Sequence, residues 1–227
     1  MLAQQVSFMG RRLKYDITGP DWRRDLEEGL EAGWQAMYQP EIDVPRPLVV
    51  DIGFGRGEFL IDLATRRPET ALLGVEYSFK RVLKMARRLS RMPIQNIRLI
   101  EARAEQVVGQ LLEKETVDEF WINFPDPWPK ARHARRRLVQ PPFVRELATR
   151  LVGGGSLFVA TDDVDYAEQI HESLSGESLL ANLNAPRRWT REVSGRMQTG
   201  YEREWREEKR LLHFFVYSRK APGRADG

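Results

Sequence analysis

The sequence predicts a doubly wound, Rossmann-like α/β fold, in which a mostly parallel sheet carries helices on both faces. Short apolar runs alternate with amphipathic helical patterns along most of the chain, which is typical of parallel sheets. The 227 residues suffice for one large domain. Sheets of this kind bind ligands beyond the carboxyl ends of their strands. The residues that directly follow each expected strand are therefore the first candidates for a functional site.

The apolar runs and helical patterns define the expected elements in order. Strands are expected over residues 48–52, 72–76, 97–100, 119–123, 156–161 and 211–218. Helices are expected over residues 58–66, 79–91, 104–113, 142–151 and 164–174, and the second of these has a strongly basic face. Right-handed crossovers between parallel strands then place helices on both faces of the sheet.

The segment before the first expected strand has its own pattern. Asp21 is a suitable helix cap, and one face of a helix over residues 21–38 carries Trp22, Leu26, Leu30, Trp34 and Met37. We expect a basic N-terminal arm and helix over residues 1–46, the main domain over 47–220, and a disordered tail over 221–227.

The composition excludes several kinds of chemistry. The chain has no cysteine and three histidines, so we expect no disulfide, thiolate zinc site, iron–sulfur cluster or cysteine nucleophile, and no metal. No apolar run is long enough to span a membrane, and the N-terminus lacks a signal-peptide pattern, so a cytoplasmic location is expected.

The basic residues are clustered although the net charge at pH 7 is only +3. A single charged run is usually a solvated face, but three basic clusters on a nearly neutral chain favour a polyanionic partner. The clusters are Arg11, Arg12 and Lys14; Lys130, Arg132, Arg135, Arg136 and Arg137; and Arg187, Arg188, Arg191 and Arg196.

A glycine-rich turn, D-I-G-F-G-R-G over residues 51–57, follows the first expected strand. Its glycines allow a tight turn and a close approach of a ligand to the backbone. Glu58 stands where the dinucleotide-binding fingerprint has its third glycine, and its charge would repel a pyrophosphate, so a zwitterionic or cationic cofactor fits better. Glu76, after the second strand, is placed to accept ribose hydroxyls, as both NAD and S-adenosylmethionine enzymes require.

The most distinctive stretch is N-F-P-D-P-W-P-K over residues 123–130. Its prolines stiffen a loop that presents Asp126, Trp128 and Lys130. For Trp128, packing within the loop is favoured over stacking on a base. After the fifth strand, Asp163 is expected to cap the next helix, which leaves Asp162 available for another role.

Taken in order, D-I-G-F-G-R-G, G-V-E, N-F-P-D-P-W-P-K, A-T-D and T-G-Y-E resemble the bacterial tRNA (guanine-N7-)-methyltransferases, from about Leu48 to Arg219. The resemblance implies a class I S-adenosylmethionine-dependent methyltransferase fold, whose last strand, here residues 211–218, is antiparallel. It also implies S-adenosylmethionine as cofactor, tRNA as partner, and a guanine N7, usually in the variable loop, as target. The chain is expected to be a monomer or a homodimer.

The resemblance also implies roles for individual residues. The cofactor-binding residues would be Asp51, Gly53, Gly55, Gly57, Glu76 and Asp126, and Asp126 would also be catalytic. The substrate-binding residues would be Lys130, Asp162, Thr199, Gly200, Tyr201 and Glu202, with Arg132, Arg135, Arg136 and Arg137 as candidates for RNA phosphate contacts.

The chain departs from the family pattern at three positions. Asp51 stands where the family usually has Glu, and Tyr201 where it has Phe. Arg103 replaces the Asp that usually lies near the adenine of the cofactor, a role for which Glu101 or Glu105 is the available substitute.

Three other functions remain open on the sequence alone. A small-molecule methyltransferase of the same fold would not need the basic clusters. An NAD-dependent enzyme disagrees with the glycine spacing and with Glu58. A non-catalytic RNA-binding relative disagrees with the intact set of carboxylates, although Arg103 keeps that alternative open.

Overall fold

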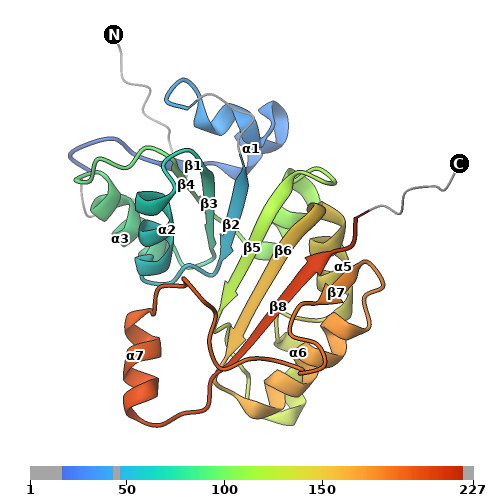
Figure 1. The fold of residues 1–227 in the computed structure, drawn as a ribbon. Coiled ribbons are helices and arrows are strands. Elements are labelled where there is room, and N and C mark those ends of the chain that lie inside the picture. Colours follow the sequence, from blue (N-terminus) through green and yellow to red (C-terminus); the bar gives the residue numbers. More distant parts are fainter. Residues whose placement is uncertain (1–16, 43–46, 222–227) are drawn as a thin grey trace, which may run out of the picture.

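The computed structural model describes residues 17–42 and 47–221, so the basic arm and the last six residues lie outside the described part. An eight-stranded sheet in the order β1-β4-β3-β2-β5-β6-β8-β7 forms its centre (Figure 1). The strands are β1 Arg23–Arg24, β2 Leu48–Ile52, β3 Ala71–Glu76, β4 Ile97–Glu101, β5 Val117–Asn123, β6 Leu151–Thr161, β7 Leu180–Asn182 and β8 His213–Arg219.

Helices connect these strands at nearly all the expected positions. The α-helices are α1 Leu26–Ala32, α2 Glu58–Arg66, α3 Phe79–Leu89, α4 Ala104–Gln106, α5 Pro141–Arg150, α6 Val164–Ser175 and α7 Gly200–Glu207. Three shorter helical segments are a 3-10 turn at Trp34–Tyr38, a π-helical segment at Val107–Leu111 and a 3-10 helix at Ala131–Arg136. The sequence does not predict β7 or α7.

The sheet is parallel from β1 to β6, while β8 runs antiparallel to both β6 and β7. Leu157 of β6 pairs with Tyr217 of β8 in this antiparallel register. The expected doubly wound sheet with an antiparallel last strand is therefore confirmed.

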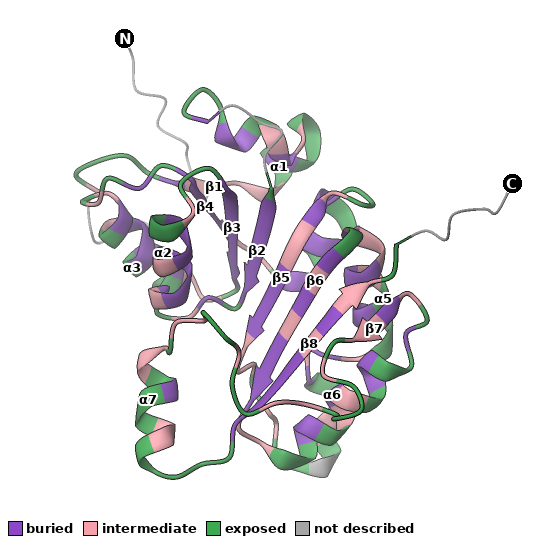
Figure 2. Cartoon of the chain, in the orientation of Figure 1, coloured by how far each residue is buried: buried purple, intermediate pink, exposed green. Residues whose placement is uncertain are grey.

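Two apolar layers cover the sheet, and the central strands between them are almost entirely buried (Figure 2). On one face, Leu60 of α2 and Met85 of α3 pack with Leu72 and other strand residues. On the other face, Val107, Leu147 of α5 and Ile170 of α6 belong to a second cluster. Because both faces are covered, β2 and β3 are buried along their whole length and consist almost entirely of apolar residues, as expected for a parallel sheet.

The N-terminal segment differs from the single helix expected over residues 21–38. Residues 23 and 24 form the edge strand β1 beside β4, and the N-cap of the following helix is Asp25 rather than Asp21. Gly33, with φ of 84°, ends α1, and Leu30 is 42% exposed instead of buried. Pairing with the sheet edge overrides the helical pattern here.

In the part of the chain that the structure describes, no helix has the length and apolar character needed to cross a membrane.

Candidate functional site

A cavity of about 210 Å³ lies at the carboxyl ends of β2 and β5. The glycine-rich turn, the loop after β5 and the start of α7 contribute its walls, although they are far apart in the sequence. Figure 1 shows α7 beyond these strand ends, below α2. The lining residues are Asp51, Gly53, Phe54, Gly55, Arg56, Gly57, Glu58, Phe59, Arg81, Asn123, Phe124, Asp126, Thr199, Tyr201 and Trp205.

The glycine-rich turn requires glycine for two different reasons. Gly53, Gly55 and Gly57 all have positive φ, between 56° and 74°, a region that side chains with a Cβ rarely adopt. At Gly53 a Cβ would meet no atom within 4 Å, so the backbone there faces open space. At Gly57 a Cβ would collide with the side chain of Met85. Gly53 thus borders open space in the cavity, whereas Gly57 allows α2 and α3 to pack closely.

This difference predicts unequal effects of alanine at the two positions. We expect Gly57→Ala to lower the free energy of unfolding by about 1–3 kcal/mol more than Gly53→Ala, because only Gly57→Ala adds overpacking to the backbone strain. Urea denaturation of both variants measures the difference. Equal losses would contradict the packing role assigned to Gly57.

Asp51 is 1% exposed at the end of β2, and its Oδ1 has no hydrogen-bond partner among the described residues. Burial raises the pKa of Asp51 to about 7; the Glu76 carboxylate adds to this rise, while the Arg196 guanidinium and the Asn123 amide oppose it. The Nδ2 of Asn123 is also buried without a partner in the described residues. The Asp51 carboxyl and the Asn123 amide therefore lie close together in the cavity wall, and the Asp51 Oδ1 and the Asn123 Nδ2 make no well-formed hydrogen bond to a described protein group.

Glu76 is 2% exposed at the end of β3. Its carboxylate accepts hydrogen bonds from the backbone N–H groups of Gly55, at 3.3 Å, and Ser78, at 3.0 Å, and lies 3.4 Å from the Arg81 guanidinium. These contacts tie the glycine-rich turn to the start of α3 and fix the carboxylate beside the cavity.

Three contacts connect α7 to the cavity walls. The Thr199 hydroxyl caps the helix by accepting from the Glu202 N–H. The Gly200 N–H donates to Glu58 Oε2 at 2.7 Å, and the Arg56 guanidinium lies 4.0 Å from the centre of the Tyr201 ring. Glu58 therefore has a structural partner on α7 in addition to its place in the cavity wall.

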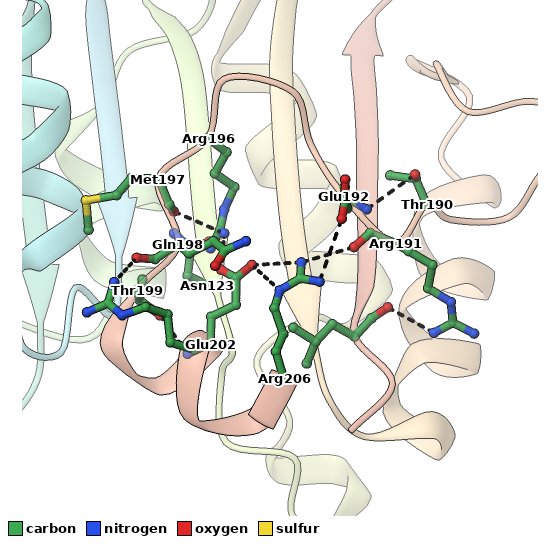
Figure 3. Close-up of polar contacts among 12 residues, drawn as sticks. Asn123, Thr190, Arg191, Glu192, Arg196, Met197, Gln198, Thr199, Glu202 and Arg206 are labelled. Carbon is green, nitrogen blue, oxygen red and sulfur yellow. Dashed lines mark hydrogen bonds and ion pairs between the residues drawn. The ribbon is translucent and has the colours of Figure 1, made fainter. Parts of the chain in front are cut away.

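A buried arginine holds the segment before α7 in place (Figure 3). Arg196 donates to Asn123 Oδ1 at 2.7 Å and forms an ion pair with Glu202. The Arg196 and Glu202 side chains are each 2% exposed, and Glu202 also pairs with Arg206 at 3.0 Å. Since Arg196 bonds to the oxygen of the Asn123 amide, it sets which end of that amide carries the unpaired donor.

The structure brings together some predicted site residues and separates others. Asp51, the three glycines, Asp126, Thr199 and Tyr201 line one cavity, with Glu76 beside it. Asp162 instead pairs with Arg210 at 3.0 Å, and Lys130 is exposed outside the cavity lining. Glu202, predicted to contact the substrate, is paired with two arginines in this structure.

The basic clusters are also divided by burial. Arg132, Arg135 and Arg136 are exposed, as expected of phosphate ligands. Arg137 is 7% exposed and donates to Pro127 O at 2.7 Å and to Gln169 at 2.8 Å, so its guanidinium supports the loop and is not presented to solvent. Asp163 caps α6 by accepting from Tyr166 N–H, as expected.

The structure also places Trp128 and the two acids, Glu101 and Glu105, that were available to substitute for the family aspartate replaced by Arg103. Trp128 is half-buried, and the Arg136 guanidinium lies 5.0 Å from its ring centre. Arg103 and Glu105 are exposed, Glu101 is half-buried, and none of the three is in the cavity lining. In the described chain, no group of three or more His, Asp or Glu is placed to hold a metal ion.

Sequence reasoning missed the roles of Asn123, Arg196, Arg56 and Trp205. Asn123 was visible in the distinctive motif, whereas Arg196 appeared only as part of a basic cluster. No local pattern identifies Arg196, because its partners lie on other elements.

Comparisons with known proteins agree with this geometry. A family model described as "Putative methyltransferase" matches residues 45–214. A protein of Bordetella pertussis is 41% identical over 167 residues, which are 70% of this chain and 66% of that protein. A protein of Geobacter metallireducens is 31% identical over 210 residues, which are 92% of this chain and 98% of that protein. Both are named tRNA (guanine-N(7)-)-methyltransferase.

Solved structures show the same fold at low identity. The 16S rRNA methyltransferase KamB superimposes with a TM-score of 0.57 and 18% identity, covering 82% of this chain and 92% of that one. The sheet order, the glycine-rich turn and these matches define a class I methyltransferase fold. Within that class, the chain belongs to the family of bacterial tRNA (guanine-N7-)-methyltransferases. It spans about two thirds, 66%, of the length of the Bordetella relative.

Proposed function

We propose that this protein transfers a methyl group from S-adenosylmethionine to N7 of a guanine in tRNA, with the variable-loop guanine as the target. One observation carries the proposal: Asp126 of the N-F-P-D-P-W-P-K loop lines the same cavity as Asp51 and the glycine-rich turn. The names of the relatives supply the substrate class, and the exposed basic residues Arg132, Arg135 and Arg136 support it.

The polar groups that line the cavity match those of the proposed methyl donor. The unpartnered Asp51 Oδ1 and Asn123 Nδ2 suit the ammonium and carboxylate of a zwitterionic amino-acid group. Open space at Gly53 allows close approach to the backbone, and the fixed Glu76 carboxylate suits ribose hydroxyls. When bound, the donor supplies an electrophilic methyl group on a sulfonium.

The residues have a limited chemical task, because guanine N7 carries an accessible lone pair. N7 loses no proton as its bond to the methyl carbon forms, so the nucleophile needs no general base. The chain contributes proximity and orientation, and a carboxylate near the base stabilises the positive charge that the guanine acquires. Asp126, at the cavity wall, is our candidate for that carboxylate.

Phosphate contacts would orient the RNA, while the cavity selects the base. Arg132, Arg135 and Arg136 are exposed on the segment that follows the N-F-P-D-P-W-P-K loop, which we call the reactive loop. Arg137 supports that loop from within. These positions support phosphate contacts next to the proposed methyl-transfer site.

Because the pKa of Asp51 is raised, we expect the stability of the ligand-free protein to depend on pH. An unfolded Asp ionises near pH 4, whereas Asp51 in the folded chain ionises near pH 7. Between these values the folded state binds more protons, so stability falls as pH rises and then levels off above about pH 7. We expect Asp51→Asn to be more stable than the parent at pH 8 by about 1–4 kcal/mol, and to differ little at pH 4.

Urea denaturation of the ligand-free proteins at pH 4, 6 and 8 measures this effect. Asp165→Asn, an exposed carboxylate on α6, is the matched control and should show no such pH trend. A stability difference for Asp51→Asn that does not change with pH would contradict a buried, high-pKa carboxyl.

The activity itself is tested with labelled S-adenosylmethionine and unmodified tRNA. We expect label in the RNA and chain scission at 7-methylguanosine after chemical cleavage. Label without scission would indicate another target atom. Label in ribosomal RNA or in a small molecule, but not in tRNA, would favour another methyltransferase activity, and donor or RNA binding without any label would favour a non-catalytic relative.

A further inference from the structure

The outer face of α3 and the turn that follows it carry a stripe of basic side chains, which we call the α3 stripe: Lys80, Lys84 and Arg88 on the helix, and Arg91 two residues beyond its end. All four residues are exposed. Residues 77–100 contain no Asp or Glu at all. Since a helix rises 1.5 Å per residue, Lys80, Lys84 and Arg88 lie along about 12 Å of helix, with charges roughly 6 Å apart. Lys84, Arg88 and Arg91 also border an open hollow of about 500 Å³.

The stripe has no partner within the described protein. None of its four side chains forms a hydrogen bond or ion pair with another described residue. The neighbouring helix α2 behaves differently, because Arg66 pairs with Asp62, and Arg67, which ends the helix, pairs with Glu119 at 2.8 Å. Arg81, in the first turn of α3 itself, pairs with Glu76.

Folding alone does not account for this arrangement. Like charges three or four residues apart on a helix repel each other, so the stripe destabilises α3 in isolation. The helix dipole favours cations in the last turn, which accounts for Arg88, but it disfavours Lys80 in the first turn, where there is no acid. A polyanion bound along the helix would convert both unfavourable terms into favourable ones.

The fold places the stripe beside the cavity. α3 begins directly after β3, and the basic segment containing Arg132, Arg135 and Arg136 follows β5. In the sheet, β3 and β5 are the two neighbours of β2, whose carboxyl end holds the cavity. Two exposed basic surfaces therefore flank the cavity, and a polyanion that places one of its units in the cavity can contact both.

We propose that the α3 stripe binds the phosphate backbone of the RNA substrate as a second contact surface, separate from the reactive loop. This inference rests on the proposed function. An RNA fits better than an anionic membrane, because the apolar residues Val82, Met85 and Leu89 of α3 are buried against the sheet. The helix therefore has no apolar face to insert between lipids.

The test uses a quadruple variant, Lys80→Gln, Lys84→Gln, Arg88→Gln and Arg91→Gln, and an unmodified tRNA transcript as probe. The affinity is measured over a series of salt concentrations. Each lost phosphate contact should reduce the slope of log affinity against log salt by roughly 0.7–0.9, so we expect a reduction of about 3 and an affinity at least about tenfold lower at low salt.

A matched quadruple variant removes the same charge elsewhere: Lys114→Gln, Arg145→Gln, Lys209→Gln and Lys220→Gln, all at exposed positions. We expect its slope to remain close to that of the parent. Circular dichroism and thermal melting check that both variants are folded.

An unchanged slope in the α3 variant, or an equal reduction in the matched variant, would overturn the inference. The inference would also be overturned if the quadruple α3 variant lost binding to vesicles of phosphatidylglycerol and phosphatidylcholine but still bound tRNA normally, since the stripe would then bind a lipid surface. If the parent protein binds no tRNA, the proposed function fails, and the stripe inference, which depends on it, fails with it. A parent that binds and methylates tRNA with a slope insensitive to the stripe overturns the stripe inference alone.

Discussion

Asp126→Asn is expected to lower the rate of methyl transfer by about 10²–10³-fold while leaving tRNA affinity nearly unchanged. The substitution keeps the shape of the side chain and removes the charge that would stabilise the methylated guanine. Asp126 is exposed and forms no hydrogen bond or ion pair with a described residue, so the change should not disturb folding. Single-turnover kinetics with saturating donor and tRNA measure the chemical step directly.

The control for this prediction removes an exposed carboxylate away from the cavity. Asp165→Asn on α6 makes the same chemical change and should methylate tRNA at the parental rate. Near-normal turnover by Asp126→Asn would exclude the charge of Asp126 as a major contribution to catalysis. A parallel loss of tRNA affinity would instead assign Asp126 a role in binding.

The elements that the sequence predicts best are those determined by local patterns. The expected helix over residues 58–66 agrees with α2 at both ends, because a glycine turn precedes it and one face is apolar. The helix α7 was not predicted. Its sequence, G-Y-E-R-E-W-R-E, has no apolar stripe, and its position depends on distant contacts such as that of Gly200 with Glu58. Long-range pairing also explains β1, which lies at the sheet edge.

The same distinction applies to the site. Asp51 lies near the carboxyl end of an expected strand, and Gly53 and Asp126 lie in the turns after expected strands. Strand order alone gathers such residues at one edge of the sheet. The structure indeed places all three around one cavity. Composition gave no indication that Arg137 and Arg196 are buried, because a cluster of basic letters does not distinguish solvated side chains from those enclosed by distant elements.

Arg196→Met is expected to lower the free energy of unfolding by about 3–5 kcal/mol, because it leaves the Glu202 carboxylate buried without its nearest partner. Arg206 only partly compensates, since its own side chain is 29% exposed. The double variant Arg196→Met with Glu202→Leu should recover most of this loss, because an apolar pair replaces the ion pair beside Phe59 and Phe214. Urea denaturation of both variants measures these differences.

A measurement of donor binding distinguishes the effect of this ion pair on stability from its effect on the orientation of the Asn123 amide. The double variant regains stability, but it still lacks the hydrogen bond that orients the Asn123 amide at the cavity wall. We therefore expect its affinity for S-adenosylmethionine, measured by calorimetry, to remain about tenfold or more below that of the parent. Arg188→Met, which breaks an exposed pair with Glu168, should cost less than about 1 kcal/mol and leave donor affinity unchanged. Full recovery of donor affinity in the double variant would mean that Arg196 acts only through stability, and that Asn123 needs no help in presenting its amide to the cavity.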